Sequence, residues 1–423
     1  MGILKVTELQ PGMVLAKDLT DVRGRFLLGR GVRLTPKHLK VLKIWGVIEA
    51  DIERVTEVEV EANLLAQIDP VLIEAVRSSL LGRFLHTDVD HPVIRELLQL
   101  CTLRKIARIS NGDASVGSSS HSGPGSPEPG LSPKKAFEEA PGHPAANNPA
   151  HRSALSTLPT IIAQFNELIH SPNSSAKDLA EVIEKDTSLS ARLLRIVNSA
   201  FYGFPSRIDT LHRTIAIVGI RQLGNLVMGI KILTVFKKIP SDLIDMQSFL
   251  EHSTATGVLA KILADYTGTQ NAERFFLGGL LHDLGRLILY NLTPAEARKN
   301  LLLARERNEL VYRMEEERMH CDHARMGGDL LREWKVPVSL ENMVRYHHQP
   351  LKAKVPFEPA IVHFADVVIN ALQVGTSGER MVPHLDSGAW ECMGLSKNHL
   401  DLAVKQFDLQ FQALSGLLQS NHR

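Results

Sequence analysis

The most informative stretch of this chain, residues 278–286, reads Gly-Gly-Leu-Leu-His-Asp-Leu-Gly-Arg. Its leucines and glycines indicate a buried helix with room beside it. An imidazole and a carboxylate on the adjacent residues His282 and Asp283 could share one metal ion or bridge two. The pair therefore points to a metal-binding site, although a His-Asp dipeptide also arises by chance in a chain with 18 histidines.

Further candidate metal ligands lie on both sides of this pair at wide spacing. The set contains five histidines and two aspartates on predicted helical segments: His252, His282, Asp283, His323, His347, His348 and Asp366. Mixed nitrogen and oxygen ligands suit iron, manganese or zinc better than a thiolate site would. Asp283 could bridge two ions, as in two-metal sites that hydrolyse phosphoryl groups. A single histidine on a helix is usually a surface residue or a hydrogen-bonded core residue. For the whole set, the spacing alone leaves metal binding and this plainer interpretation equally open.

The sequence around these residues resembles the HDOD branch of the HD superfamily of metal-dependent phosphohydrolases. The resemblance covers about residues 153–420 and rests on short words in a fixed order: Leu158-Pro159, residues 193–200 (Leu-Leu-Arg-Ile-Val-Asn-Ser-Ala), residues 279–285, Asp322-His323-Ala324, Trp334 with Val336-Pro337, and His347-His348. It implies a mainly α fold with a multi-helix, HD-like C-terminal domain.

The resemblance also implies a site. In the related HD-GYP phosphodiesterases the metal ligands match the seven residues given above, which implies one or two divalent ions, iron or manganese. Asp283 and Arg286 would be the catalytic residues, because Arg286 stands where that branch has a lysine near the substrate phosphate. The Gly-Tyr-Pro signature is missing, since Gln349-Pro350-Leu351-Lys352 follows His347-His348. Its absence argues against hydrolysis of cyclic dinucleotides such as cyclic di-GMP.

The sequence is compatible with two functions. The one we favour is a bacterial signal-transduction regulator or adaptor, whose HDOD domain binds a signalling partner or a nucleotide-type ligand and carries a metal site. Many HDOD domains lack a complete metal site, and catalysis is not generally established for them. The alternative is a metal-dependent phosphohydrolase acting on a cyclic dinucleotide or a nucleotide phosphate. In that reading the ions activate water and Arg286 pairs with a phosphate.

A change in composition divides the chain. Residues 110–152 are rich in Ser, Gly and Pro and nearly lack large apolar side chains. Burial therefore cannot offset the entropy of ordering them, and we expect a disordered linker. Before it we expect a small β-rich α+β domain over residues 1–58, with a helix capped by Thr35, and a helical extension over residues 59–109. The small domain resembles one often found ahead of HD-GYP and HDOD domains. The HDOD domain would take residues 153–423.

The overall composition bounds the partners. Among 423 residues, 48 are basic and 47 acidic, which gives a net charge of +1 and indicates neither nucleic acid nor an anionic membrane as a partner. No run approaches the ~20 apolar residues that span a bilayer, and no export signal is evident. Three widely separated cysteines fit a reducing compartment. We therefore expect a cytoplasmic protein that binds no DNA, RNA or membrane.

Overall fold

The computed structural model describes most of the chain outside the predicted linker. The described residues are 2–6, 9–20, 26–44, 47, 49–53, 69–110, 163–165, 167–168, 171, 174–199, 201–202, 204, 207–234, 236 and 239–418. Within them the chain is mainly helical, as the sequence predicts. Except for Ser110, which ends a helix, the predicted linker lies outside the described residues.

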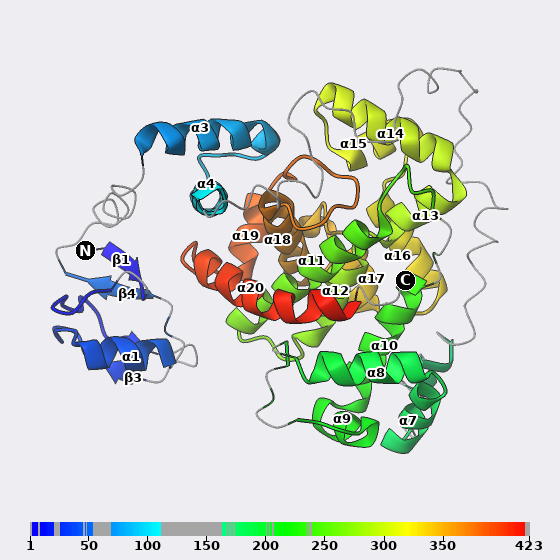
Figure 1. Cartoon of the computed structure of the whole chain (residues 1–423), viewed down its shortest axis with the longest axis horizontal. Helices are drawn as coiled ribbons and strands as arrows, with labels where there is room; N and C mark the ends of the chain where they lie inside the picture. The colour runs from blue at the N-terminus through cyan, green and yellow to red at the C-terminus, as the bar shows by residue number, and fades with distance from the viewer. Residues whose placement is uncertain are drawn as a thin grey trace.

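The N-terminal region combines short strands with one helix (Figure 1). Its strands form two antiparallel pairs, β1 (Gly2–Lys5) with β4 (Glu49–Ile52) and β2 (Leu19–Thr20) with β3 (Phe26–Leu28). The helix α1 (Pro36–Ile44) begins as predicted, because the Thr35 hydroxyl accepts the backbone N–H of His38 at 3.2 Å. Its core is separate from that of the helical region and includes Leu4, Leu15, Leu34, Leu42 and Ile52.

The helical extension consists of α3 (Pro70–Leu81), η1 (Gly82–Phe84) and α4 (Pro92–Ser110). Its buried side chains, such as Leu97, belong to the same hydrophobic core as the C-terminal helices. Arg104 on α4 also donates two hydrogen bonds, of 2.5 and 2.9 Å, to the carboxylate of Asp408. The extension therefore packs as part of the C-terminal region, although it precedes the predicted linker.

The C-terminal region is a succession of helices (Figure 1). The first group is α7 (Ala176–Glu184), α8 (Thr187–Val197), α9 (Leu211–Val218) and α10 (Ile220–Thr234). The second group is α11 (Met246–Tyr266), α12 (Glu273–Leu281), α13 (Leu284–Leu292), α14 (Pro294–Arg307), α15 (Val311–Met319), α16 (His323–Glu333), α17 (Val338–Arg345), η4 (Pro350–Lys352), α18 (Phe357–Leu372), α19 (Ser387–Met393) and α20 (His399–Leu418).

Glycines let the helices of the second group approach closely. A Cβ on Gly279 of α12 would lie 2.6 Å from the backbone of Gly257 on α11. A Cβ on Gly285 of α13 would collide with the backbone carbonyl of His323 on α16. Real Cβ atoms do not approach backbone atoms this closely, so glycine at both positions is what allows α11, α12, α13 and α16 to pack together.

None of the described helices is by itself long and apolar enough to cross a bilayer. The bent pair Leu211–Val218 and Ile220–Leu233 is long and apolar enough only when its two helices are taken together.

Candidate metal centre

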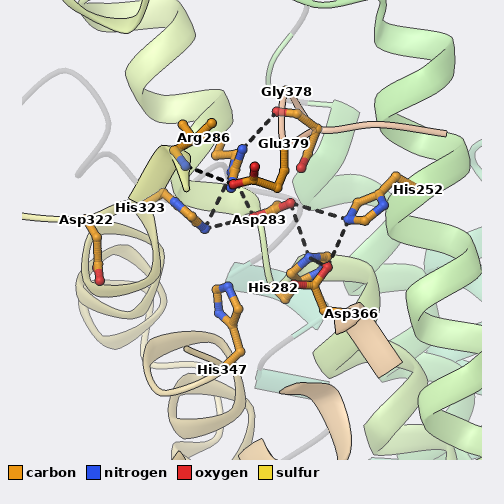
Figure 2. Close-up of polar contacts among 12 residues, drawn as sticks. His252, His282, Asp283, Arg286, Asp322, His323, His347, Asp366, Gly378 and Glu379 are labelled. Carbon is orange, nitrogen blue, oxygen red and sulfur yellow. Dashed lines mark hydrogen bonds and ion pairs between the residues drawn. The ribbon is translucent and has the colours of Figure 1, made fainter. Parts of the chain in front are cut away.

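The seven predicted ligands come together from six helices and the breaks between them. Figure 2 labels all of them except His348. They come from α11 (His252), the α12–α13 junction (His282 and Asp283), the start of α16 (His323), the turn after α17 (His347 and His348) and α18 (Asp366). All are buried except His348, which is half-buried. Residues up to 114 positions apart in sequence thus share one site.

Helix ends orient several of these side chains. The His-Asp pair was expected inside a buried helix, but it lies in the turn between two helices, with His282 as the C-cap of α12 and Asp283 as the N-cap of α13. This break turns both side chains toward the same interior space (Figure 2). Similarly, the Asp322 side chain caps α16 by accepting the backbone N–H of Arg325 at 2.8 Å, which places His323 in the first turn.

Asp283 lies at the middle of the set. Its Oδ2 is 3.2 Å from His282 Nε2 and 3.6 Å from His252 Nε2. Its Oδ1 is 2.9 Å from His323 Nε2, on the other side. We therefore distinguish a first half of the centre (His252, His282 and Asp366) from a second half (His323 and His348), with Asp283 and His347 between them.

Three nitrogen atoms in the first half and beside it lack hydrogen bonds to the described residues. The Nε2 atoms of His252, His282 and His347 are buried and make no hydrogen bond of normal geometry with any described residue. Asp366 Oδ1 lies 3.2 Å from the first and 3.4 Å from the second. A buried polar atom left in this state costs roughly 1–3 kcal/mol. A cation between these nitrogens and the carboxylates would satisfy them, so the residues present fit a metal ion.

Backbone carbonyls fix the orientation of two imidazoles. His282 Nδ1 lies 2.7 Å from the carbonyl of Gly279, and His347 Nδ1 lies 2.7 Å from the carbonyl of Val344. A carbonyl can only accept, so Nδ1 carries a proton in both rings. In the neutral ring the lone pair is then on Nε2, facing the centre. This is the usual way in which proteins orient histidine ligands.

The second half is connected by its own hydrogen bonds. His323 Nδ1 is 2.6 Å from a Glu315 oxygen, and its Nε2 is 3.0 Å from His348 Nε2 as well as close to Asp283. Arg286 Nε lies 3.1 Å from Asp283 Oδ1 and 3.5 Å from His323 Nε2. The His348 ring stacks on Tyr312 with centroids 4.1 Å apart.

The charges of the centre are strongly coupled. Burial lowers the pKa of His282, but Asp283 and Asp366 outweigh burial and raise it to about 10. Burial also lowers the pKa of His323, but the carboxylates of Glu315 and Asp283 outweigh burial and raise this pKa to about 9. By contrast, burial and the neighbouring imidazoles lower the pKa of His347. Without a metal the carboxylates are therefore balanced by protonated imidazoles, and a bound metal ion would replace those protons.

Known proteins share this fold. A family model for the HDOD domain matches residues 155–350. An HDOD domain protein of unknown function from Geobacter sulfurreducens is 20% identical with a TM-score of 0.52, covering 64% of this chain and 96% of that one. A candidate phosphohydrolase from Shewanella amazonensis SB2B is 23% identical with a TM-score of 0.51, covering 64% and 99%. At these identities the likeness establishes the fold.

The chain carries an HDOD domain. An uncharacterized protein of Treponema pallidum (strain Nichols) is 27% identical over 227 residues, which is 53% of this chain and 44% of that protein. The chain thus spans less than half the length of this curated relative. The family match ends at residue 350, so Asp366 lies beyond the matched part of the HDOD domain.

A segment after α18 covers one side of the HDOD centre. We call residues 373–386 the strap. Arg286, which is 2% exposed, has its Nη1 3.4 Å from the Ser377 carbonyl and its Nη2 3.8 Å from Glu379. The Tyr290 hydroxyl donates to the same Ser377 carbonyl at 2.6 Å. Gly378 has φ 109°, and a side chain there would meet the Tyr290 hydroxyl, so this turn needs glycine.

Sequence reasoning missed the residues that support the ligands. Asn370 donates to Asp366 Oδ1 at 2.7 Å, and the spacing of four residues on one helix could have revealed this contact. Glu315 and Glu379 come from other segments, and no local pattern connects them to the HDOD ligands. Glu379 is held by the backbone N–H groups of Val311, Arg380 and Met381.

Proposed function

We propose that this chain is a signal-transduction regulator whose HDOD domain holds a divalent iron or manganese ion in the His/Asp centre. The observation that supports metal binding is the group of buried Nε2 atoms on His252, His282 and His347 that make no hydrogen bond with described residues. Those of His252 and His282 lie beside the carboxylates of Asp366 and Asp283, at 3.2 Å in each case. Imidazole with carboxylate is a ligand set suited to these metals.

The residues of the chain would divide the work of holding the ion. His252, His282, Asp283 and Asp366 would bind it directly. The Gly279 carbonyl and Asn370 would orient His282 and Asp366, since each makes a hydrogen bond of 2.7 Å to its ligand. A bound ion of this kind can polarise a phosphoryl oxygen or lower the pKa of a water molecule.

The surroundings of Arg286 favour a regulator over an enzyme. Its guanidinium is buried, and its partners are Asp283, the Ser377 carbonyl and Glu379 of the same chain. A substrate phosphate would have to displace the strap contacts before it could reach this side chain. The missing Gly-Tyr-Pro signature supports the same ranking. The partner we propose is a signalling protein, with a nucleotide-type ligand as an additional candidate.

Elemental analysis of protein purified without chelator tests the metal assignment. We expect about one or two iron or manganese ions per chain, as in mononuclear and two-metal centres. The double variant His282→Ala/Asp283→Ala should contain none while keeping the helical circular dichroism of the wild type. Full metal content in that variant would mean that the ion binds elsewhere in the protein.

The regulatory role can be tested apart from the metal. Asn198 at the end of α8 holds the start of the next segment, because its amide exchanges two hydrogen bonds of 2.7 Å with the backbone of Ile208. Deleting the gene in the source bacterium defines a phenotype. If the protein is a regulator of this kind, a gene encoding Asp283→Ala should return the deletion strain to wild-type behaviour. A gene encoding Asn198→Ala should fail to do so. The opposite pattern would favour an enzyme. Gly203, a second position of interest in the sequence, lies outside the described residues.

The second candidate function is a metal-dependent phosphohydrolase. It is favoured by Asp283, whose two oxygens face opposite halves of the centre as a bridging carboxylate would. The test is hydrolysis of bis(p-nitrophenyl) phosphate and of a cyclic dinucleotide by protein loaded with manganese or iron. We expect little turnover. Robust hydrolysis that disappears in folded Asp283→Ala protein would make the phosphohydrolase the correct function.

A further inference from the structure

Seven ligands are enough for two ions, but a side chain of the protein already lies beside the place of the second. Arg286 Nε is 3.1 Å from Asp283 Oδ1 and 3.5 Å from His323 Nε2. These are two of the atoms that an ion in the second half would need. Among the described residues, no ion pair joins an arginine or lysine to the corresponding atoms of the first half, where Asp283 Oδ2 faces the imidazoles of His252 and His282.

We propose that the Arg286 guanidinium acts as the second cation of the centre, so that this chain holds one metal ion, in the first half. This inference rests on the proposed metal binding and adds where the ion lies and how many bind. Arg286 thereby becomes a positioning residue that neutralises Asp283 Oδ1, in place of the phosphate-binding role that the family resemblance implies.

The charge of Arg286 is permanent and its position is fixed. A guanidinium does not lose its proton in proteins, so it opposes a dication at every accessible pH. The side chain leaves α13 only three residues after Asp283 and is 2% exposed. Its other end meets the Ser377 carbonyl and the Glu379 carboxylate of the strap. A second dication could enter only if these contacts were given up.

The strap does not depend on Arg286 for its own shape. Glu379 also accepts hydrogen bonds of 2.9, 2.9 and 3.1 Å from the backbone N–H groups of Val311, Arg380 and Met381. Tyr290 independently holds the Ser377 carbonyl. Replacement of Arg286 by an uncharged side chain of similar length should therefore remove the charge and leave the fold in place.

The experiment counts manganese ions in wild type and three variants. Arg286→Met removes the charge, Arg286→Lys keeps it, and Arg104→Met removes a partly buried arginine whose carboxylate partner is Asp408 rather than a residue of the centre. Each protein is saturated with Mn(II), desalted and measured by elemental analysis and electron paramagnetic resonance. We expect about one ion per chain in wild type, Arg286→Lys and Arg104→Met, with the six-line spectrum of isolated Mn(II). Arg286→Met should take about two and show exchange coupling, as in a two-metal site.

The outcomes separate this inference from the metal assignment itself. Two ions in the wild type, or one ion in folded Arg286→Met protein, would overturn the role of Arg286 while leaving metal binding intact. No ion in the wild type would overturn both. If Arg286→Met fails to fold, Arg286→Gln replaces it, and the wild-type count still decides between one ion and two.

Discussion

The two halves of the centre contain similar residues but differ in what surrounds them. In the first half, the Nε2 atoms of His252 and His282 are buried without hydrogen bonds to described residues. In the second half, His323 contacts Glu315, Asp283 and His348 at 2.6, 2.9 and 3.0 Å. The same residue type can therefore lie beside carboxylates without a well-aligned hydrogen bond, as His252 and His282 do, or belong to a hydrogen-bonded network, as His323 does. The partners decide which, because an ion binds where polar atoms lack other partners.

The largest effect should come from the first half. His252→Ala removes a nitrogen that faces both carboxylates, with Asp366 Oδ1 at 3.2 Å. We expect manganese affinity to fall by more than the roughly 100-fold that loss of an outer partner can cost. Competition with a fluorescent chelator measures the affinity. A change of only a few-fold would mean that the ion does not use the first half.

The second largest effect on manganese affinity should come from Asn370, which orients a ligand of the first half. Asn370→Ala removes the 2.7 Å hydrogen bond to Asp366 Oδ1 and leaves the ligand itself in place. Loss of such an outer contact typically lowers metal affinity by about 10- to 100-fold. The matched control is Asn300→Ala, which alters a buried amide in α14 whose partners are Arg318 and Met319 rather than a candidate ligand. Equal losses in both variants would point to general destabilisation, so thermal unfolding of the metal-free proteins accompanies the titration.

The pH dependence of manganese affinity should show how many protons the ion displaces from the centre. The pKa of His282 is raised to about 10, so this imidazole is protonated at neutral pH in the metal-free protein and must lose its proton to bind an ion. Affinity should therefore rise with pH, by about tenfold per unit below pH 10 for one proton. An ion in the second half would also displace the proton of His323, whose pKa is about 9. A slope near two would thus contradict binding in the first half alone.

The smallest effect should come from His348. This side chain is half-buried, stacks on Tyr312 and contacts His323. If the ion lies in the first half, His348→Ala should change manganese affinity by less than about tenfold, below the range for direct supports of a ligand. The same titration with His252→Ala provides the comparison. Comparable losses in the two variants would erase the distinction between the halves.

Much of the fold could be predicted from local sequence. The spacing of Leu179, Val182 and Ile183 predicts one apolar helix face, and α7 forms there with Leu179 and Ile183 buried. Thr35 followed by proline likewise predicts the start of α1, because helix capping depends only on residues that are close in sequence. The helical extension was expected before the linker, but only the structure shows that Leu97 and its neighbours complete the C-terminal core.

The sequence by itself determined the identity and order of the seven candidate ligands, because residue chemistry and the words of the HDOD family are local properties. Only the tertiary structure decided which of them have hydrogen-bond partners among the described residues. Glu315 reaches His323 from another helix, and Glu379 reaches Arg286 from the strap, 93 positions further along the chain. No pattern within a segment encodes such contacts. They arise when α13, α15, α16 and the strap pack together, and they set the charge and hydrogen bonding that separate the two halves of the centre.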